Sequence, residues 1–190
     1  GTRDSIANAI SEVDNVVSYR LYDNPTPVDR PEADGLTFNV VVRGGTNTDI
    51  AKAIYDNKPL NVQTSGDTVV PVATADGQAE NIFFTRAKES QYDLKITYVA
   101  NNTTPLNSLE IADIEDSVAG FLDSQPIGLG VSNSQLTSAV LVGLPAGRLL
   151  SVRVDLKRPS EGSEAFLQGD INLSFDQYAT ISTFTYERTT

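Results

Sequence analysis

At 190 residues the chain is long enough for one large domain or two small ones, and 39% apolar with 21% charged residues is typical of a globular protein. The formal net charge of −11 at pH 7 argues against a nucleic-acid-binding surface, because such a surface needs clustered Lys and Arg to neutralise phosphates. The absence of Cys and His excludes disulfides, thiolate nucleophiles, the Ser-His-Asp triad and the metal sites built from these residues.

The chain opens with the pattern of a helix followed by two strands. Apolar residues recur at helical spacing over 4–13, with Asp4 or Ser5 as the N-cap, and alternate over 16–22 as in a strand. Residues 23–35 carry three prolines and four carboxylates and predict a surface loop, partly ordered and partly mobile. A second strand is then expected, with Leu36, Phe38, Val40 and Val42 on one face and Thr37, Asn39 and Arg43 on the other.

A double glycine, Gly44-Gly45, ends this strand and precedes a short helix over 47–57. Thr46 and Asp49 resemble a capping box at the start of the helix. Glycines before a helix N-terminus can hold a phosphate, but no Walker-type Lys-Ser/Thr pair follows, and Asp49 would put a carboxylate where the phosphate would lie. A tight turn with a helix cap is therefore the favoured interpretation. The buried face of the helix is expected to carry Ile50, Ala53 and Ile54.

Four more strands complete the first hundred residues. Their expected ranges are 60–64, 68–74, 80–86 and 91–99. A turn at Ala75-Asp76-Gly77 joins the second of these strands to the third. The alternation in the fourth strand directs four residues inward, namely Tyr92, Leu94, Ile96 and Tyr98.

Polar turn-forming residues over 101–105 separate two runs of regular pattern and predict a domain boundary. Beyond them, an amphipathic helix is expected over 108–122, and a further helix begins with Ser132 or Ser134 as its N-cap. The chain then closes with three expected strands, over 148–157, 169–175 and 179–187.

These elements predict an α+β fold of two small domains, residues 1–100 and 101–190, each a mixed or antiparallel sheet covered by one or two helices. A helix followed by a strand recurs in the two halves, over residues 6–22 and 136–156. An internal duplication would explain this recurrence, and chance similarity is the alternative because few residues match.

Two groups of acidic residues are candidates for chemistry. Those of the loop 23–35 could bind Ca²⁺, but they lack the alternate-residue spacing of a calcium loop and prolines interrupt them. The second group lies on the polar side of the helix 108–122 and consists of Glu110, Asp113, Glu115 and Asp116. A glycoside hydrolase would need two such carboxylates about 5–10 Å apart in a cleft. The sequence therefore predicts no catalytic residue, no cofactor and no metal ion.

Several short motifs follow one another in a characteristic order. The most specific run begins at Gly44-Gly45 and continues into the helical Ile-Ala-x-Ala-Ile-Tyr sequence of Ile50–Tyr55. The other motifs are Asp23-Asn24, Asp34-Gly35, Val40–Gly45, Lys58, Thr64–Gly66, Asp76-Gly77, Phe84–Arg86, Ile127-Gly128 and Ser134–Leu136. Over nearly its whole length the chain thus resembles the C-terminal portion of the baseplate J-like proteins of contractile phage tails and tailocins.

This resemblance implies a non-enzymatic structural domain of a baseplate wedge, which links the hub to the periphery and takes part in the rearrangement that triggers sheath contraction. The implied partners are other wedge or hub proteins, with self-association as a further option, and the implied location is the virion tail baseplate, assembled in the bacterial host cytoplasm. The family's N-terminal part, which builds the wedge core bundle, is absent. Without an initiator Met, the chain is expected to be either processed or a fragment of a longer protein, and the fragment, with Gly1-Thr2 as a cloning remnant, is the favoured interpretation. No nucleic acid and no membrane span is expected.

The residues expected to matter are architectural: Gly44, Gly45, Ile50, Ile54, Tyr55, Gly66 and Arg86. The glycines would form turns, the isoleucines would pack the helix on a sheet, and Arg86 would either bond a carboxylate or be solvated. The alternative function is a carbohydrate- or cell-surface-binding module of a phage tail or adhesin, which would use exposed tyrosines and the loops 23–35 and 100–106. A hydrolase with a carboxylate pair is the least favoured hypothesis.

Overall fold

The computed structural model describes residues 1–159 and 165–189, and this part of the chain divides into two compact units. Unit 1 consists of Gly1–Lys88, Pro126–Gly128 and Phe175–Gln177, and unit 2 contains the rest of the described chain. The division falls after Lys88, so the boundary expected after residue 100 is corrected. The reason is that residues 89–100 pair with strands of unit 2 and bury their apolar side chains in its core.

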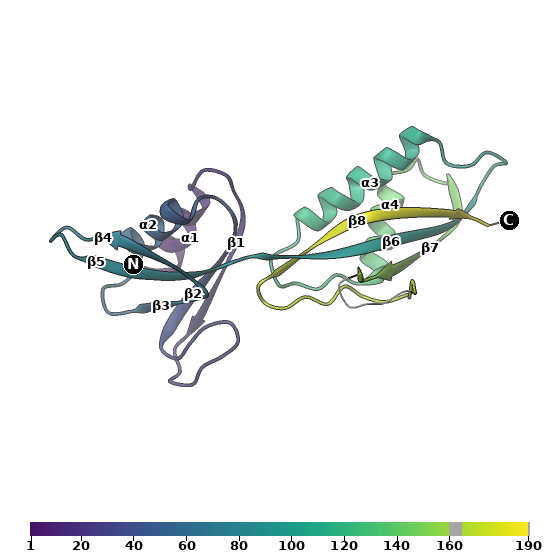
Figure 1. The fold of residues 1–190 in the computed structure, drawn as a ribbon. Coiled ribbons are helices and arrows are strands. Elements are labelled where there is room, and N and C mark those ends of the chain that lie inside the picture. Colours follow the sequence, from purple (N-terminus) through teal and green to yellow (C-terminus); the bar gives the residue numbers. More distant parts are fainter. Residues whose placement is uncertain (160–164, 190) are drawn as a thin grey trace. The chain divides into compact units, whose positions relative to one another are not determined.

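Unit 1 is a five-stranded mixed sheet with two helices. The strand order is β1-β2-β5-β4, and β3 also pairs with β2. β2 is parallel to β3 and β5, whereas β1 and β4 are the antiparallel partners of β2 and β5. The elements, labelled in Figure 1, are α1 (Arg3–Ser11), β1 (Val16–Asn24), β2 (Thr37–Gly44), α2 (Asn47–Asn57), β3 (Gln63–Ser65), β4 (Thr68–Ala73) and β5 (Ala79–Arg86).

Both faces of the central strand β2 are buried. Phe38, Val40 and Val42 pack with α1 and α2, as the alternation predicted. On the opposite face, Val41 is fully buried and Asn39 is 3% exposed. Three consecutive apolar residues, Val40, Val41 and Val42, are typical of a strand that is covered on both faces.

The loop between β1 and β2 covers part of this second face and is ordered by one buried amide. Asn24 is 1% exposed, and its Nδ2 donates to the carbonyl oxygens of Val28 and Ala33 at 2.8 and 2.9 Å. Leu36 was expected in the buried face of β2, but it is 62% exposed with φ +60°. It belongs to the turn before the strand, which begins at Thr37.

The segments 126–128 and 175–177 belong to unit 1 although the chain around them does not. The Ile127 carbonyl accepts a hydrogen bond from Arg20 at 2.6 Å, and the Phe175 carbonyl accepts one from Tyr22 at 3.0 Å. The Tyr22 and Phe175 rings also meet edge to face, with centroids 5.7 Å apart. These contacts lie on the face of the sheet opposite the helices, because Arg20 and Tyr22 alternate with the buried Leu21.

Unit 2 is a three-stranded sheet in the order β7-β6-β8 with two helices. Its elements are β6 (Lys88–Ala100), α3 (Ser108–Asp123), α4 (Asn133–Val142), β7 (Leu149–Lys157) and β8 (Gln177–Arg188). β6 and β7 are antiparallel. The hydrogen bonds between β6 and β8 join Thr180 to Glu89, Ser182 to Asp93 and Thr189 to Tyr98. Residue numbers rise together along both strands, so β8 is parallel to β6 and the sheet is mixed.

The core of unit 2 lies between the sheet and the helices. The four inward residues expected in β6 are all buried, at 5% exposure or less. They pack against one face of α3 and α4, whose buried residues include Ile114, Val118, Leu136 and Val140. The expected α+β class, with helices on mixed sheets, is therefore confirmed.

Two local expectations were wrong. The N-cap of α1 is Thr2 rather than Asp4 or Ser5, because Ser5 occupies the third helical position and completes the capping box. The strand expected over 169–175 does not form. Ile171 makes only an isolated two-bond bridge to Val131, and Phe175 already belongs to unit 1.

Candidate interaction surfaces

The double glycine after β2 forms a tight turn that no other residue would fit. Gly44 and Gly45 have φ of +82° and +67°, the left-handed region that favours glycine. The Gly45 N–H donates to the Asn15 carbonyl at 2.8 Å, and a Cβ on Gly44 would lie only 2.1 Å from that oxygen. Thr46 then caps α2 by accepting the Asp49 N–H at 3.2 Å. The expected turn and cap are confirmed.

Arg86, at the end of β5, ties this turn to the sheet. Its Nη2 donates to the Gly45 carbonyl at 3.3 Å. Nη1 of Arg86 is buried without a hydrogen-bond partner in the part of the chain that the structure describes. The expectation of a carboxylate partner or full solvation is corrected, since the side chain reaches a backbone oxygen across the parallel β2–β5 pair.

The other architectural residues also lie inside unit 1. Ile50 and Ile54 are fully buried, and Tyr55 packs at the border of the same core. Gly66 has φ +145°, and a Cβ there would lie 2.3 Å from the backbone of Phe84. The seven residues chosen from the sequence therefore build a scaffold, and interaction surfaces must be sought elsewhere.

Two further motif residues connect α2 and β3 to β5. The ammonium of Lys58, whose side chain is 5% exposed, lies 2.7 Å from a Glu80 carboxylate oxygen. Thr64 Oγ1 accepts the Phe83 N–H at 2.8 Å. Both contacts hold the segment after α2 against the sheet, and neither partner residue was identified from the sequence.

A polar cavity of about 310 Å³ lies on unit 1 beside the loop 30–34. One side of the cavity carries a cluster of paired charges, because Lys88 Nζ lies 2.9 Å from Asp176 and 3.1 Å from Asp67. The hydrogen bond to Asp176 raises the pKa of Lys88 above its ordinary value, and the bond to Asp67 adds to this. Asn39 donates to Glu32 and Thr85, but its Oδ1 has no partner among the described groups. The polar groups at this side of the cavity thus bind one another, which leaves them less available to a ligand.

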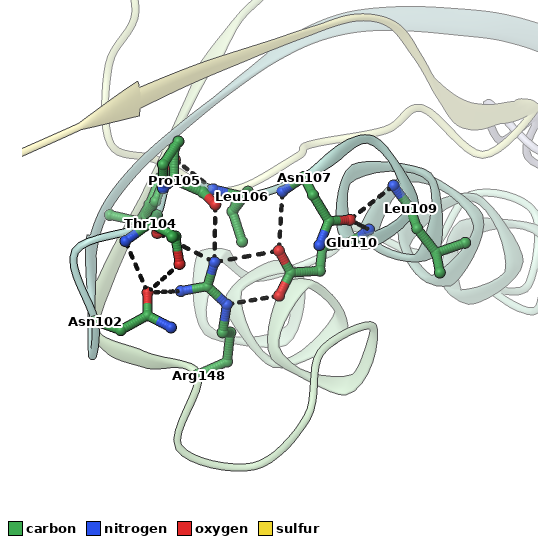
Figure 2. Close-up of polar contacts among 9 residues, drawn as sticks. Asn102, Thr104, Pro105, Leu106, Asn107, Leu109, Glu110 and Arg148 are labelled. Carbon is green, nitrogen blue, oxygen red and sulfur yellow. Dashed lines mark hydrogen bonds and ion pairs between the residues drawn. The ribbon is translucent and has the colours of Figure 1, made fainter.

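In unit 2, Arg148 holds the loop 101–107 against α3, as Figure 2 shows. Its Nε and Nη2 bind the two oxygens of Glu110 at 2.5 and 3.2 Å. The same guanidinium donates to Asn102 Oδ1 at 3.0 Å and to the Pro105 carbonyl at 2.9 Å. This loop was expected to be a domain boundary, but it lies within unit 2, where Arg148 binds it to α3 and Arg188 donates to the carbonyls of Asn102 and Thr103.

The same carboxylate completes the cap of α3. Asn107 Oδ1 accepts the N–H groups of Leu109 and Glu110, and Glu110 Oε2 accepts the Asn107 N–H at 2.9 Å (Figure 2). The hydrogen bond from Arg148, followed by that from Asn107, lowers the pKa of Glu110 below its usual range. Glu110 is therefore held in its charged form as a structural residue.

The remaining acids of α3 do not gather at one place. Glu115 accepts a long hydrogen bond from the Tyr186 hydroxyl at 3.4 Å, and burial, followed by this carboxylate, raises the pKa of Tyr186. Asp113 and Asp116 are exposed. Among the described residues, no three His, Cys, Asp or Glu side chains are grouped to hold a metal ion.

Sequence reasoning missed Arg148, Lys88 and Asp176. One signal pointed to Arg148: it is the first basic residue after Lys95, and the intervening stretch contains five carboxylates. No local pattern could have paired Lys88 with Asp176, since the two are far apart along the chain.

Comparison with known proteins adds no family assignment. No family model matches the chain, and no curated protein matches it. In the described ranges, no helix combines the length and apolar character needed to cross a membrane.

Proposed function

We propose that this chain is a non-enzymatic structural domain of a contractile-tail baseplate wedge. In this role it links the hub to the periphery and takes part in the rearrangement that triggers sheath contraction. Its place is the virion tail baseplate, assembled in the bacterial host cytoplasm, and its partners are other wedge or hub proteins.

One observation carries the proposal: the motif residues that resemble the baseplate J-like proteins have connected structural roles in unit 1. Gly44-Gly45 forms the turn after β2, and Arg86 bonds that turn. Lys58 and Thr64 attach the following segment to β5. A set of motifs that specifies the framework of a domain supports common architecture more strongly than scattered surface matches would.

The chemistry of the side chains also supports an assembly role. The basic residues Arg86, Lys88 and Arg148 are engaged with groups of their own unit. Glu110, the most strongly bound acid of α3, is paired with one of them rather than with a second carboxylate. These contacts stabilise folded surfaces and offer no paired acid and base to a substrate.

Copurification with tail proteins tests the proposal. Proteins encoded beside this gene would be coexpressed with the tagged chain, and we expect at least one sheath-, tube- or hub-associated protein to remain bound through size-exclusion chromatography. A genomic neighbourhood without tail genes, or a folded chain that binds none of their products, would contradict the proposal. The Gly44→Val variant is the matched control, because its disrupted framework should abolish the complex.

The carbohydrate-binding alternative predicts a different result. It would give saturable binding on a glycan array, which a wedge domain should not show. Of the tyrosines that could stack sugars, Tyr92 and Tyr98 are about 5% exposed or less, and the Tyr22 ring contacts Phe175 edge to face and has the Arg20 guanidinium over it. These rings therefore offer little free surface for stacking on a sugar.

A further inference from the structure

An apolar groove of about 390 Å³ runs between α3 and α4 on the outer side of unit 2. Ser117 Oγ of α3 donates to the Ala139 carbonyl of α4 at 2.8 Å, which ties the two helices together at the floor of the groove. The lining is mostly apolar surface from short side chains, and it consists of Ser117, Phe121, Ser134, Gln135, Ser138, Ala139 and Val142.

Each helix contributes one continuous stripe to this groove. On α4 the lining positions Gln135, Ser138, Ala139 and Val142 have the i, i+3, i+4, i+7 spacing of a single helix face. This face differs from the one that α4 buries in the core through Leu136 and Val140. Val142 lies on this face and is 79% exposed, so it offers apolar surface beside the groove lining.

Two exposed acids of α3, Asp113 and Asp116, lie beside the residues that line the groove and are called its rim here. Asp113 precedes Ser117 by four residues, so it extends the Ser117–Phe121 stripe of α3 by one turn. A Cβ on Gly143 would lie 2.6 Å from the Asp113 carbonyl, which places the Val142 end of α4 close to Asp113. Asp113 and Asp116 are both exposed, and no Lys or Arg occurs in α3, in α4 or in the segment between them.

The negative charge beside the groove favours some binding partners over others. A second copy of the chain would bring the same acidic rim and a net charge of −11, and an anionic membrane or nucleic acid would be repelled in the same way. A basic segment would be attracted, because opposite charges at the rim steer association while apolar anchors supply affinity.

We propose that the α3–α4 groove is the docking site for an amphipathic helix of a partner protein, whose apolar face fills the groove and whose flanking Lys or Arg residues meet Asp113 and Asp116. A helix fits because the floor is formed by small residues that allow close approach, and because a third helix can pack on two that already lie side by side. This inference goes beyond the proposed function, since it depends only on the groove and its charges.

A synthetic peptide provides the probe. It is an 18-residue amphipathic helix with Leu at i, i+3, i+4 and i+7 spacing and Lys on its flanks, and a second peptide replaces every Lys with Glu. Fluorescence anisotropy measures binding at low and high salt, and amide chemical shifts measured by NMR locate the site on the protein. We expect saturable binding of the Lys peptide alone, weakened by salt, with shifts concentrated in α3 and α4.

Variants with matched controls separate groove binding from general attraction to an acidic protein. Asp113→Asn with Asp116→Asn should weaken binding about three- to tenfold and flatten its salt dependence, whereas Glu12→Gln with Asp14→Asn removes the same charge from exposed positions of unit 1 without this effect. Val142→Ser should weaken binding about fivefold, whereas Val28→Ser, at another exposed valine, should leave it unchanged.

Several results would overturn the inference. One is the lack of saturable binding by the Lys peptide, and another is equal binding of the Glu peptide, which would leave no role for the rim. Shifts outside α3 and α4, or equal loss of affinity in the control variants, would show nonspecific attraction. A dimer in sedimentation experiments that Val142→Ser dissociates would assign the groove to a second copy of the chain. Because no tail protein takes part in these measurements, failure here leaves the copurification test of the baseplate role intact.

Discussion

Each unit holds one irregular segment in place, unit 1 at the end of a strand and unit 2 against a helix, and the interactions that do so differ. In unit 1 the turn after β2 depends on backbone conformation, because Gly44 and Gly45 adopt positive φ where a Cβ would collide. In unit 2 the loop 101–107 depends on the ion pair between Arg148 and Glu110. Steric fit is independent of pH, whereas an ion pair requires a charged carboxylate. The turn in unit 1 should therefore be sensitive to added volume, and the loop in unit 2 to acid.

The two sheets also differ in how far their central strands are buried. The central strand of unit 1 is buried on both faces, whereas β6 of unit 2 alternates buried with partly exposed residues. The outer helices of unit 2 also carry the unpartnered groove. Unit 1 thus reads as a scaffold, and unit 2 as the part that keeps a surface available.

The largest expected effect comes from the two cores. Ile54→Ala in unit 1 and Ile114→Ala in unit 2 each remove a fully buried side chain and should lower the free energy of unfolding by about 2–5 kcal/mol. Hydrogen exchange followed by mass spectrometry would measure the loss of protection in each unit. If the units are separately cooperative, each variant loses protection mainly in its own unit. Equal loss in both would break the comparison.

A smaller effect is expected at the glycine turn. Gly44→Ala should cost about 1–2 kcal/mol for the left-handed conformation, together with a further cost for the clash with Asn15. Gly77→Ala is the matched control, because Gly77 has a similar φ of +83° but nothing lies within 4 Å of its added Cβ. Urea unfolding should therefore give a larger loss for Gly44→Ala. Equal losses of stability in the two variants would mean that the positive φ, rather than the contact with Asn15, makes glycine necessary at position 44.

The bond between Arg86 and the turn should contribute less. Arg86→Lys keeps the charge but loses the directed Nη2 contact with the Gly45 carbonyl, and we expect a loss of about 1 kcal/mol in unit 1. Arg30→Lys, in the exposed loop of the same unit, should cost nothing measurable in the same urea titration. An unchanged midpoint for Arg86→Lys would show that the bond does not stabilise the turn.

The smallest effect is a pH dependence of the loop 101–107 and the start of α3 in unit 2. The pKa of Glu110 is lower in the folded chain than in the unfolded one, so its stabilisation is present above the unfolded value and is lost as the pH falls through the folded value. Acidification should thus reduce amide protection at the start of α3 before it affects the Gly44-Gly45 turn. Glu110→Gln should remove this difference and Asp116→Asn should not. Loss of amide protection in the Gly44-Gly45 turn at the same pH would contradict this difference between the turn and the loop.

Local patterns in the sequence were reliable where neighbours along the chain decide the structure. The alternation of Tyr92, Leu94, Ile96 and Tyr98 correctly predicted the inward face of β6. The cap at Thr46 was also predicted correctly, and Ser132 was one of the two caps expected for α4, because a cap depends only on the next few residues. The double glycine was interpreted correctly for the same reason.

Errors arose where remote segments compete for the same residues. Residues 101–105 have the composition of a linker, yet Arg148 binds them to α3. Residues 169–175 have the alternation of a strand, yet within this range only Ile171 forms a backbone bridge in unit 2, and Phe175 packs on Tyr22 in unit 1. The partners, Arg148 and Tyr22, lie far from these segments along the chain, so a local pattern cannot include them.

The sequence by itself determined the α+β class, the positions of the helices, the cap at Thr46 and the inward residues of β6, because these follow from spacings of two to four residues. Only the tertiary structure decided which strands share a sheet, which unit each segment joins, and which charges pair. Those choices depend on contacts between residues that are distant in the chain, where many partners have similar chemistry and only packing selects one.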